Sequence, residues 1–189
     1  MKTSVMIALA VGALALLVFF YHRHSRVVSS GPVVHVRNEF EFTARGPYRV
    51  VAPLFGPEGE RAWADGHWDP HFLYPQPAQD IQGAVFTVRH GHRHAYWINT
   101  TFDMNARHFQ YVYVIPDAMV VLIDVRFSEL DPGNTKVNVA YERTALNPEA
   151  NEHVREMGES DRANGKEWGT AINDYLAKQA VKPSQSIRD

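Results

Sequence analysis

Hydrophobic and polar residues alternate with a period of two in a series of segments after residue 33. Such alternation predicts strands that bury one face. Tight turns rich in Gly, Pro, Asp and Asn separate neighbouring segments, so we expect the strands to form an antiparallel meander. The predicted strands are Val34–Phe42, His71–Tyr74, Ala84–Arg89, Ala95–Phe102, Arg107–Ile115, Met119–Glu129 and Thr135–Thr144.

Two other segments have a helical pattern. Residues Pro47–Ala64 fit short helical turns that are broken at Gly56-Pro57. Near the C-terminus, Asn147-Pro148-Glu149 offers an N-cap followed by Pro at the first helical position. Apolar residues then recur at spacings of three and four as far as Leu176, which predicts one long amphipathic helix. Because Gly158, Gly165 and Gly169 weaken its middle, we expect a bend there.

The order of these elements predicts an α+β domain. A single helix cannot cover a flat sheet of six strands. We therefore expect a curved antiparallel sheet of six to seven strands that wraps around the C-terminal helix, with two short helices after the first strand. Aromatic side chains would line the space between sheet and helix.

The N-terminus carries a different signal. Val5–Tyr21 is seventeen residues long and has no charge, which reaches the low end of the ~17–25 residues that cross a bilayer. The basic cluster His22–Arg26 follows in place of a small-residue cleavage site, so we favour a retained transmembrane helix over a cleaved signal peptide. Lys2 on one side balances Arg23 and Arg26 on the other, which leaves the side of the soluble domain open.

These patterns divide the chain into four parts. Residues 1–26 are a membrane anchor with a basic flank, and residues 27–33 are a linker. Residues 34–180 form the folded domain, and residues 181–189 form a polar tail. We therefore expect a single-pass membrane protein with one soluble domain.

Composition narrows the function. Nineteen Lys and Arg stand against twenty-one Asp and Glu without basic blocks, which gives no electrostatic footprint for nucleic acid. The absence of Cys excludes disulfides, thiol nucleophiles and zinc–thiolate sites. Ten Phe, eight Tyr and four Trp supply large apolar surfaces, some with polar tips, and these suit the walls of a ligand cavity.

The apolar faces of the predicted strands and helix indicate which residues line that cavity. On the central strand, Ile123 and Val125 lie on the purely apolar face, which should point inward. The alternative is that the same residues pack a solid core. The predicted cavity residues are Trp97, Asn99, Tyr111, Tyr113, Ile123, Val125, Tyr141, Trp168 and Ile172.

Two further groups of residues have alternative interpretations. Trp63 and Trp68 could form a lid at the mouth of the cavity or a plug beneath the short helices. His90, His92 and His94 could converge on a metal ion if they shared a strand face. Gly91 instead places them at a hairpin tip, so we expect an exposed polar turn, no metal and no cofactor. No pair of carboxylates or Ser–His–acid arrangement is evident, and we assign no catalytic residue.

The chain also resembles a known superfamily. Phe55-Gly56-Pro57-Glu58-Gly59-Glu60, Trp68-Asp69-Pro70, Tyr74-Pro75 and Val139–Leu146 before the last helix are similar to the START-like (SRPBCC) superfamily of polyketide cyclases and lipid-transfer domains. The resemblance covers Val34–Leu176 and implies the helix-grip fold. Members of this superfamily differ in activity, so the fold alone does not transfer a function.

We therefore expect a membrane-anchored domain that binds a hydrophobic or amphipathic small molecule, such as a lipid, between the sheet and the C-terminal helix. One alternative is an enzyme of the cyclase or dehydratase type that acts on a polyketide-like substrate, with a buried Tyr or His as acid or base. Another is a domain that binds a protein partner through an aromatic groove. The oligomeric state is left open.

Overall fold

A computed structural model of the protein describes residues 31–64, 66, 68–91 and 93–181. The described residues from Val33 to Val181 form one compact unit. The predicted anchor, residues 1–26, lies outside the described residues, as do most of the linker and of the polar tail. No helix in the described part of the chain is both long and apolar enough to cross a bilayer.

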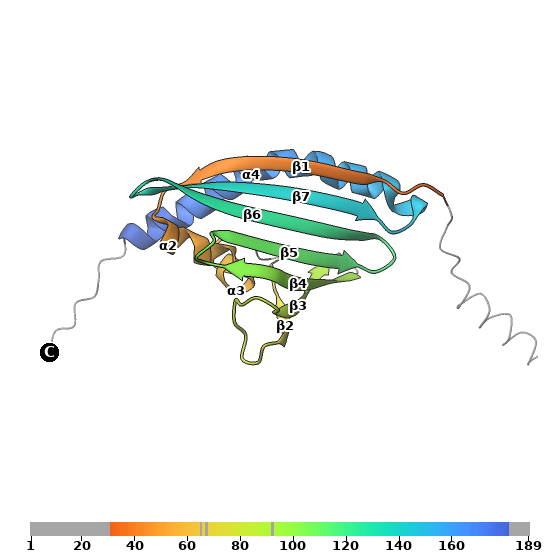
Figure 1. Cartoon of the computed structure of the whole chain (residues 1–189), viewed down its shortest axis with the longest axis horizontal. Helices are drawn as coiled ribbons and strands as arrows, with labels where there is room; N and C mark the ends of the chain where they lie inside the picture. Colours follow the sequence, from red (N-terminus) through yellow and green to blue (C-terminus); the bar gives the residue numbers. More distant parts are fainter. Residues whose placement is uncertain (1–30, 65, 67, 92, 182–189) are drawn as a thin grey trace, which may run out of the picture. The chain divides into compact units, whose positions relative to one another are not determined.

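Seven strands form one antiparallel sheet within the described residues, in the order β1-β7-β6-β5-β4-β3-β2 (Figure 1). Consecutive strands from β2 to β7 pair with each other, and β1 pairs with β7. The predicted α+β meander is therefore confirmed. The strands are β1 (His35–Ala44), β2 (His71–Tyr74), β3 (Val85–His90), β4 (Arg93–Asp103), β5 (His108–Ile115), β6 (Met119–Asp131) and β7 (Asn134–Ala145).

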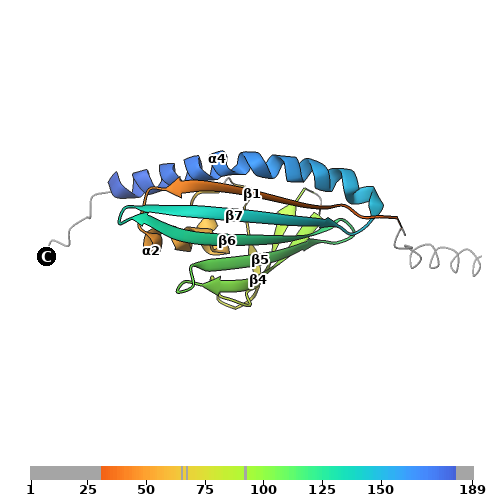
Figure 2. The ribbon, with the colours of Figure 1, turned by 45° about the horizontal axis from the view of Figure 1, so that its top comes forward.

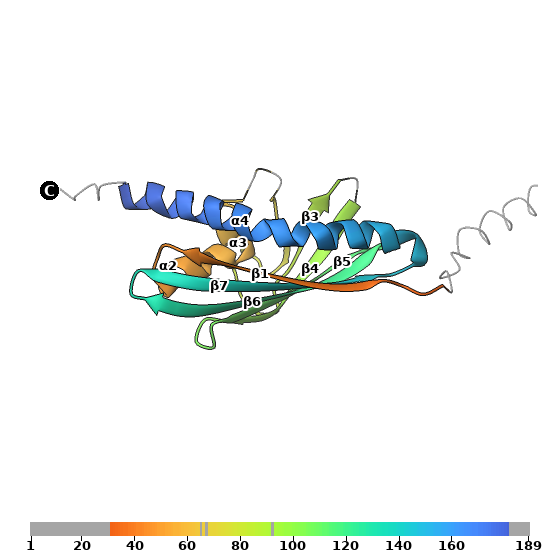
Figure 3. The same cartoon turned by 90° about the horizontal axis from the view of Figure 1, so that it is seen from above.

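Short helices follow β1, as the sequence predicted. They are α2 (Tyr48–Val51), the 3-10 turn η1 (Ala52–Phe55) and α3 (Pro57–Glu60). After β7, the 3-10 turn η2 (Pro148–Ala150) leads into the long helix α4 (Asn151–Val181). Helix α4 runs along β1 (Figure 2), and α2 and α3 lie on the same side of the sheet as α4 (Figure 3). This is the helix-grip arrangement.

The start of the last helical segment is fixed by Asn147. Its Oδ1 accepts a hydrogen bond from the backbone N–H of Ala150 at 2.9 Å, and its Nδ2 donates to the carbonyl oxygen of Asp117 at 2.6 Å. The first bond satisfies one of the donors that a helix start leaves free. The predicted N-cap is confirmed, and it ties the helix start to the β5–β6 turn.

The inner face of β6 follows from its alternation. The residues of the apolar set are buried, whereas Leu122 and Asp124 between them are only partly buried. Because one face of each strand is apolar, a shift by one residue would expose the whole set, so the register is strongly specified. The buried set is Met119, Val121, Ile123, Val125 and Phe127.

The glycines of α4 lie where the helix approaches β1 most closely. A Cβ on Gly158 would lie 2.9 Å from Val36 Cγ2, and a Cβ on Gly165 would lie 2.9 Å from Phe40 Cδ2. Both distances are below those at which real side-chain carbons pack. Helix α4 is continuous from Asn151 to Val181. These glycines are therefore contact points with the sheet.

Candidate functional site

A cavity of about 360 Å³ lies among the sheet, the short helices and α4. This volume falls at the lower end of the ~300–1,000 Å³ typical of small-molecule sites. Most of the wall is aromatic or aliphatic. The lining residues are Phe55, Pro57, Glu60, Trp63, Ala64, Trp68, Phe86, His90, Trp97, Tyr111, Tyr113, Ile123, Val125, Tyr141, Arg143, Met157, Glu167, Trp168 and Ala171.

The structure brings most of the predicted cavity residues to this wall. They are Trp97, Tyr111, Tyr113, Ile123, Val125, Tyr141 and Trp168. Two predicted residues lie elsewhere. Asn99 is fully buried beside the start of β3, where its Nδ2 donates to the carbonyl oxygen of Ile81 at 3.1 Å. Ile172 is fully buried in the core, where α4 packs on the sheet.

The rings of the wall pack against one another in two groups. Near α4, the ring centroids of Trp63 and Trp168 are 5.4 Å apart in a T-shaped arrangement. Further along the sheet, Trp97 stacks on Tyr113 with centroids 4.2 Å apart, and Trp68 meets Trp97 edge-on at 5.4 Å. Both geometries are favourable for aromatic pairs. Each of these side chains therefore packs against at least one other ring of the wall.

Glu60 is a carboxyl group on this aromatic wall, at the end of α3. Among the described residues, no side chain or backbone group forms a hydrogen bond or ion pair with its carboxylate. Burial raises the pKa of Glu60 well above its ordinary value, and the nearby charge of Asp80 raises it further. A carboxyl group in an apolar site favours its neutral form in this way. Such a perturbed group in a cavity is a candidate for binding or acid–base chemistry.

The charge of Glu60 contributes to the pKa of two tyrosine hydroxyls, those of Tyr111 and Tyr141. Tyr111 donates a hydrogen bond to the carbonyl oxygen of Phe55 at 2.5 Å. Burial raises the pKa of Tyr111 well above its ordinary value, and the charge of Glu60 adds to this effect. Burial likewise raises the pKa of Tyr141, with smaller contributions from Tyr113 and Glu60. Both phenols therefore stay protonated, and both residues line the cavity.

Arg143 is the one fully cationic side chain among the described residues of the wall, and its charge is already paired. Its Nε donates to Asp161 Oδ2 at 2.7 Å, and its Nη2 donates to Asp161 Oδ1 at 2.5 Å. Its Nη1 donates to the hydroxyl of Tyr113 at 2.7 Å. The guanidinium carbon also lies 4.7 Å from the centroid of the Tyr141 ring. Arg143 therefore joins β7, β5 and α4, and it leaves no strong positive charge for an anionic ligand.

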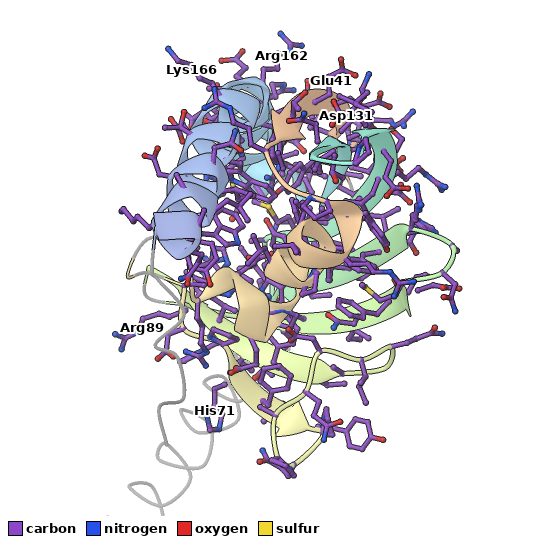
Figure 4. All side chains as sticks on the ribbon, turned by 90° about the vertical axis from the view of Figure 1, so that its left-hand side faces the viewer. Glu41, His71, Arg89, Asp131, Arg162 and Lys166 are labelled. Atoms are coloured by element: carbon purple, nitrogen blue, oxygen red, sulfur yellow. The ribbon has the colours of Figure 1, made fainter. Side chains whose placement is uncertain are left out.

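The structure corrects the expectation that His90 belongs to an exposed turn. Strand β3 extends to His90, where alternation turns this side chain inward, while Arg89 points away from the domain (Figure 4). The His90 ring stacks on Tyr113 at 5.6 Å and lines the cavity. Burial lowers the pKa of His90, and the charge of Arg143 lowers it further, so the ring is neutral near pH 7.

The metal site considered from the sequence would also need His92 and His94 beside His90. His94 is exposed on β4, and His92 lies outside the described residues. Across residues 31–181, apart from the three undescribed positions, no group of three His, Cys, Asp or Glu side chains could hold a metal ion.

Trp63 and Trp68 both line the cavity and are half-buried. Trp63 Nε1 donates to the carbonyl oxygen of Leu54 at 2.6 Å, and Trp68 Nε1 donates to that of Pro57 at 2.8 Å. The backbone of the short helices thus holds both indoles. Their role as a lid stays a prediction.

Sequence reasoning missed the polar residues of the site. Arg143 continues the inward alternation of Val139 and Tyr141, and Asp161 lies on the apolar stripe of α4 seven residues after Val154. A charged residue on each of two buried faces could have predicted this pair. Glu60 gave no such signal, because its segment is too short to show a period.

No family model matches the sequence, and no curated protein sequence matches it. Solved structures do share its fold. Norcoclaurine synthase from Thalictrum flavum is similar over 84% of this chain and 94% of its own, with a TM-score of 0.59 and 9% identity. A putative uncharacterized protein from Rhizobium leguminosarum is similar over 78% of this chain and 97% of its own, with a TM-score of 0.54 and 17% identity.

A third structure, SA2116 from Staphylococcus aureus, a protein of unknown function, is similar over 79% of this chain and 98% of its own. Its TM-score is 0.56 and its identity is 13%. Structural similarity at such low sequence identity supports a shared fold, and it does not support a shared reaction or ligand. The comparisons therefore establish that this chain has the helix-grip fold expected from its resemblance to the START-like superfamily.

Proposed function

We propose that this protein binds an amphipathic small molecule in the cavity between its sheet and α4. The observation that carries the proposal is the wall itself, which combines packed aromatic rings with the carboxyl of Glu60 and the hydroxyls of Tyr111 and Tyr141. Mostly apolar walls with a few placed polar groups are typical of small-molecule sites. The volume of about 360 Å³ suits a ligand of one or two rings better than a two-chain phospholipid.

The test is the binding of 2-(2-naphthyl)ethanol, a neutral fluorescent molecule with two rings, to the purified full-length protein. We expect saturable binding of one molecule per chain, measured by calorimetry and by the fluorescence of the probe. Replacing Ile123 by Trp should fill the cavity and weaken binding at least about tenfold, at a stability cost below the ~1–3 kcal/mol of an overpacked core.

The matched control is Leu122→Trp. Leu122 neighbours Ile123 on β6, but its side chain lies on the outer face of the sheet. This variant adds the same indole and should bind the probe as the wild type does. Absence of saturable binding to the wild type would contradict the proposal, as would equal binding by both tryptophan variants.

We further propose that residues 1–26 hold the domain at a membrane. The support is the uncharged stretch Val5–Tyr21 followed by a basic cluster. A ligand that partitions into a bilayer would reach a tethered domain more readily. After alkaline extraction of cell membranes, the full chain should stay in the pellet, and a chain without residues 1–26 should be released. Release of the full chain would overturn the anchor.

A second candidate function is acid–base catalysis on the bound molecule, and Glu60 is the observation that favours it. A carboxyl with a raised pKa is a stronger base when ionised than an ordinary one. As a base, Glu60 would take a proton from a carbon next to a ligand carbonyl, and a phenol would donate to the oxygen of the resulting enolate.

Deuterium exchange provides the test for this second candidate. With 2-naphthylacetone in D₂O, the wild type should accelerate exchange at the methylene carbon, and Glu60→Gln should not. Equal exchange rates with wild type, with Glu60→Gln and without protein would leave binding as the function.

A further inference from the structure

We propose that the cavity selects an amphipathic amine, with its ammonium group beside Glu60 and the Trp63–Trp168 pair and its apolar body along the sheet. This inference rests on the proposed binding function and names the chemical class of its ligand.

The charges that face the cavity are the first argument. Glu60 has an unpaired carboxylate among the described residues, and Glu167 on α4 adds a second, more exposed carboxylate to the wall. The cation of Arg143 is neutralised by the carboxylate of Asp161, to which it donates two hydrogen bonds. His90 is uncharged near pH 7 because burial lowers its pKa. The wall is therefore acidic, and it favours a positively charged ligand over an anion.

The rings near Glu60 are the second argument. Trp63 follows Glu60 by one helical turn, and its backbone N–H donates to the Glu60 carbonyl oxygen at 3.1 Å. Trp168 and Phe55 pack against Trp63 with ring centroids at 5.4 Å and 6.3 Å. The faces of such rings attract an ammonium group, and Trp does so most strongly. Glu60 and these rings line the same cavity, so its wall provides both interactions that an organic cation needs.

Neutral and anionic ligands fit this wall less well. An anion would enter beside two carboxylates with no unpaired guanidinium or ammonium group on the wall to meet it. A neutral ligand would leave Glu60 in its protonated form and would gain no attraction between opposite charges. A cation adds the attraction between opposite charges to its contact with the carboxyl of Glu60.

Proton exchange is an independent consequence of the geometry. In the empty cavity, burial favours the protonated form of Glu60. The groups that interact electrostatically with it are Asp80 before β3, Tyr111 on β5 and Tyr141 on β7. Glu167 on α4 lines the same cavity, and none of these four groups carries a positive charge. When an ammonium group binds, the carboxyl must give up its proton to pair with it. Amine binding should therefore release protons into the buffer, whereas binding of the neutral alcohol should not.

The experiment compares three probes of nearly equal size: 2-(2-naphthyl)ethylamine, 2-(2-naphthyl)ethanol and 2-naphthylacetate. Each is titrated into the full-length protein by calorimetry at pH 6 in two buffers that differ in ionisation enthalpy. We expect the amine to bind at least about tenfold more tightly than the alcohol and to release protons. The acetate should bind more weakly than the alcohol.

Two variants identify the group responsible. In Glu60→Gln, a substitution of the same shape, the preference for the amine and the proton release should both vanish while alcohol binding persists. Glu167→Gln serves as the matched control and should keep most of the preference. Equal binding of amine and alcohol by the wild type would refute the inference while leaving the binding function in place, as would a preference that survives in Glu60→Gln. If none of the three probes binds, the binding function and this inference fail together.

Discussion

Arg143 on β7 and Asp161 on α4 form a bidentate ion pair in the interior, with N–O distances of 2.5 Å and 2.7 Å. Both side chains are almost fully buried. The pair lies where the long helix crosses the sheet and is extended by the hydroxyl of Tyr113. A planar guanidinium matches both oxygens of a carboxylate, so this contact fixes the direction as well as the distance between the two elements.

Removing one partner of this pair should be costly. We expect Asp161→Ala to lower the free energy of unfolding by about 3–5 kcal/mol, because Arg143 would be left buried without a counter-charge. Urea unfolding of the full-length protein measures this change. Glu159→Ala, at an exposed position of the same helix, is the control and should stay within about 0.5 kcal/mol.

The double variant Arg143→Met, Asp161→Leu tests the physical reason. Replacing both charges by apolar groups removes the desolvation cost together with the attraction. It should therefore be clearly more stable than Asp161→Ala. A loss of less than 1 kcal/mol in Asp161→Ala would show that the pair contributes little to the fold.

Gly165→Ala should destabilise the protein although alanine is the better helix former. The new Cβ would lie 2.9 Å from Phe40 Cδ2 and 3.0 Å from Phe40 Cβ. Overpacking of this kind costs ~1–3 kcal/mol, against a gain in helix propensity of ~1 kcal/mol. Thermal unfolding of the variant should therefore show a lower melting temperature.

Ala163→Gly, at an exposed position of α4, separates the two effects. It should lose ~1 kcal/mol through helix propensity alone. Gly165→Ala adds a methyl group and Ala163→Gly removes one, and both variants should thus be less stable than the wild type. An increase in stability for Gly165→Ala would mean that α4 does not pack as closely on Phe40 as described.

The stability difference between Glu60→Gln and the wild type should depend on pH. In the folded state burial raises the pKa of Glu60 above its ordinary value of 4.5, so the folded protein binds more protons than the unfolded chain above that pH. The contribution of Glu60 to wild-type stability therefore falls as pH rises through the interval between the two pKa values. Gln does not titrate, so the variant should gain stability relative to the wild type as pH rises.

Urea unfolding at several pH values from 4 to 8 measures this difference. Glu159→Gln, at an exposed position, should show no such trend. A pH-independent difference for Glu60→Gln would show that the carboxyl of Glu60 is as well solvated in the folded state as in the unfolded one.

His90 and His94 should respond differently to the same change. His90→Ala removes ring contacts with Tyr113 and Trp97 and should cost about 1–2 kcal/mol, given ~0.5–1.5 kcal/mol for each aromatic pair. His94→Ala, at an exposed position, should stay within about 0.5 kcal/mol. Chemical unfolding of the two variants measures both values. Equal losses of stability in His90→Ala and His94→Ala would indicate that both side chains lie on an exposed polar turn.

The sequence by itself determined the elements and their order. Alternation with a period of two is a direct signature of a half-buried strand, and the spacing of apolar residues is a direct signature of an amphipathic helix. Asn147 marked the start of the last helical segment through its own side chain. Because these signals are local, the sheet, the short helices and the long helix could all be predicted.

Only the tertiary structure decided the chemistry of the site. Arg143 and Asp161 are eighteen residues apart in sequence, and their pairing became evident only when the fold brought them together. Gly165 looked like a weak point in α4 and is the place where Phe40 needs room. Glu60 comes from a helix of four residues and lines the cavity together with residues of β5, β7 and α4. Burial and pairing depend on distant segments meeting in space, and no local pattern encodes that meeting.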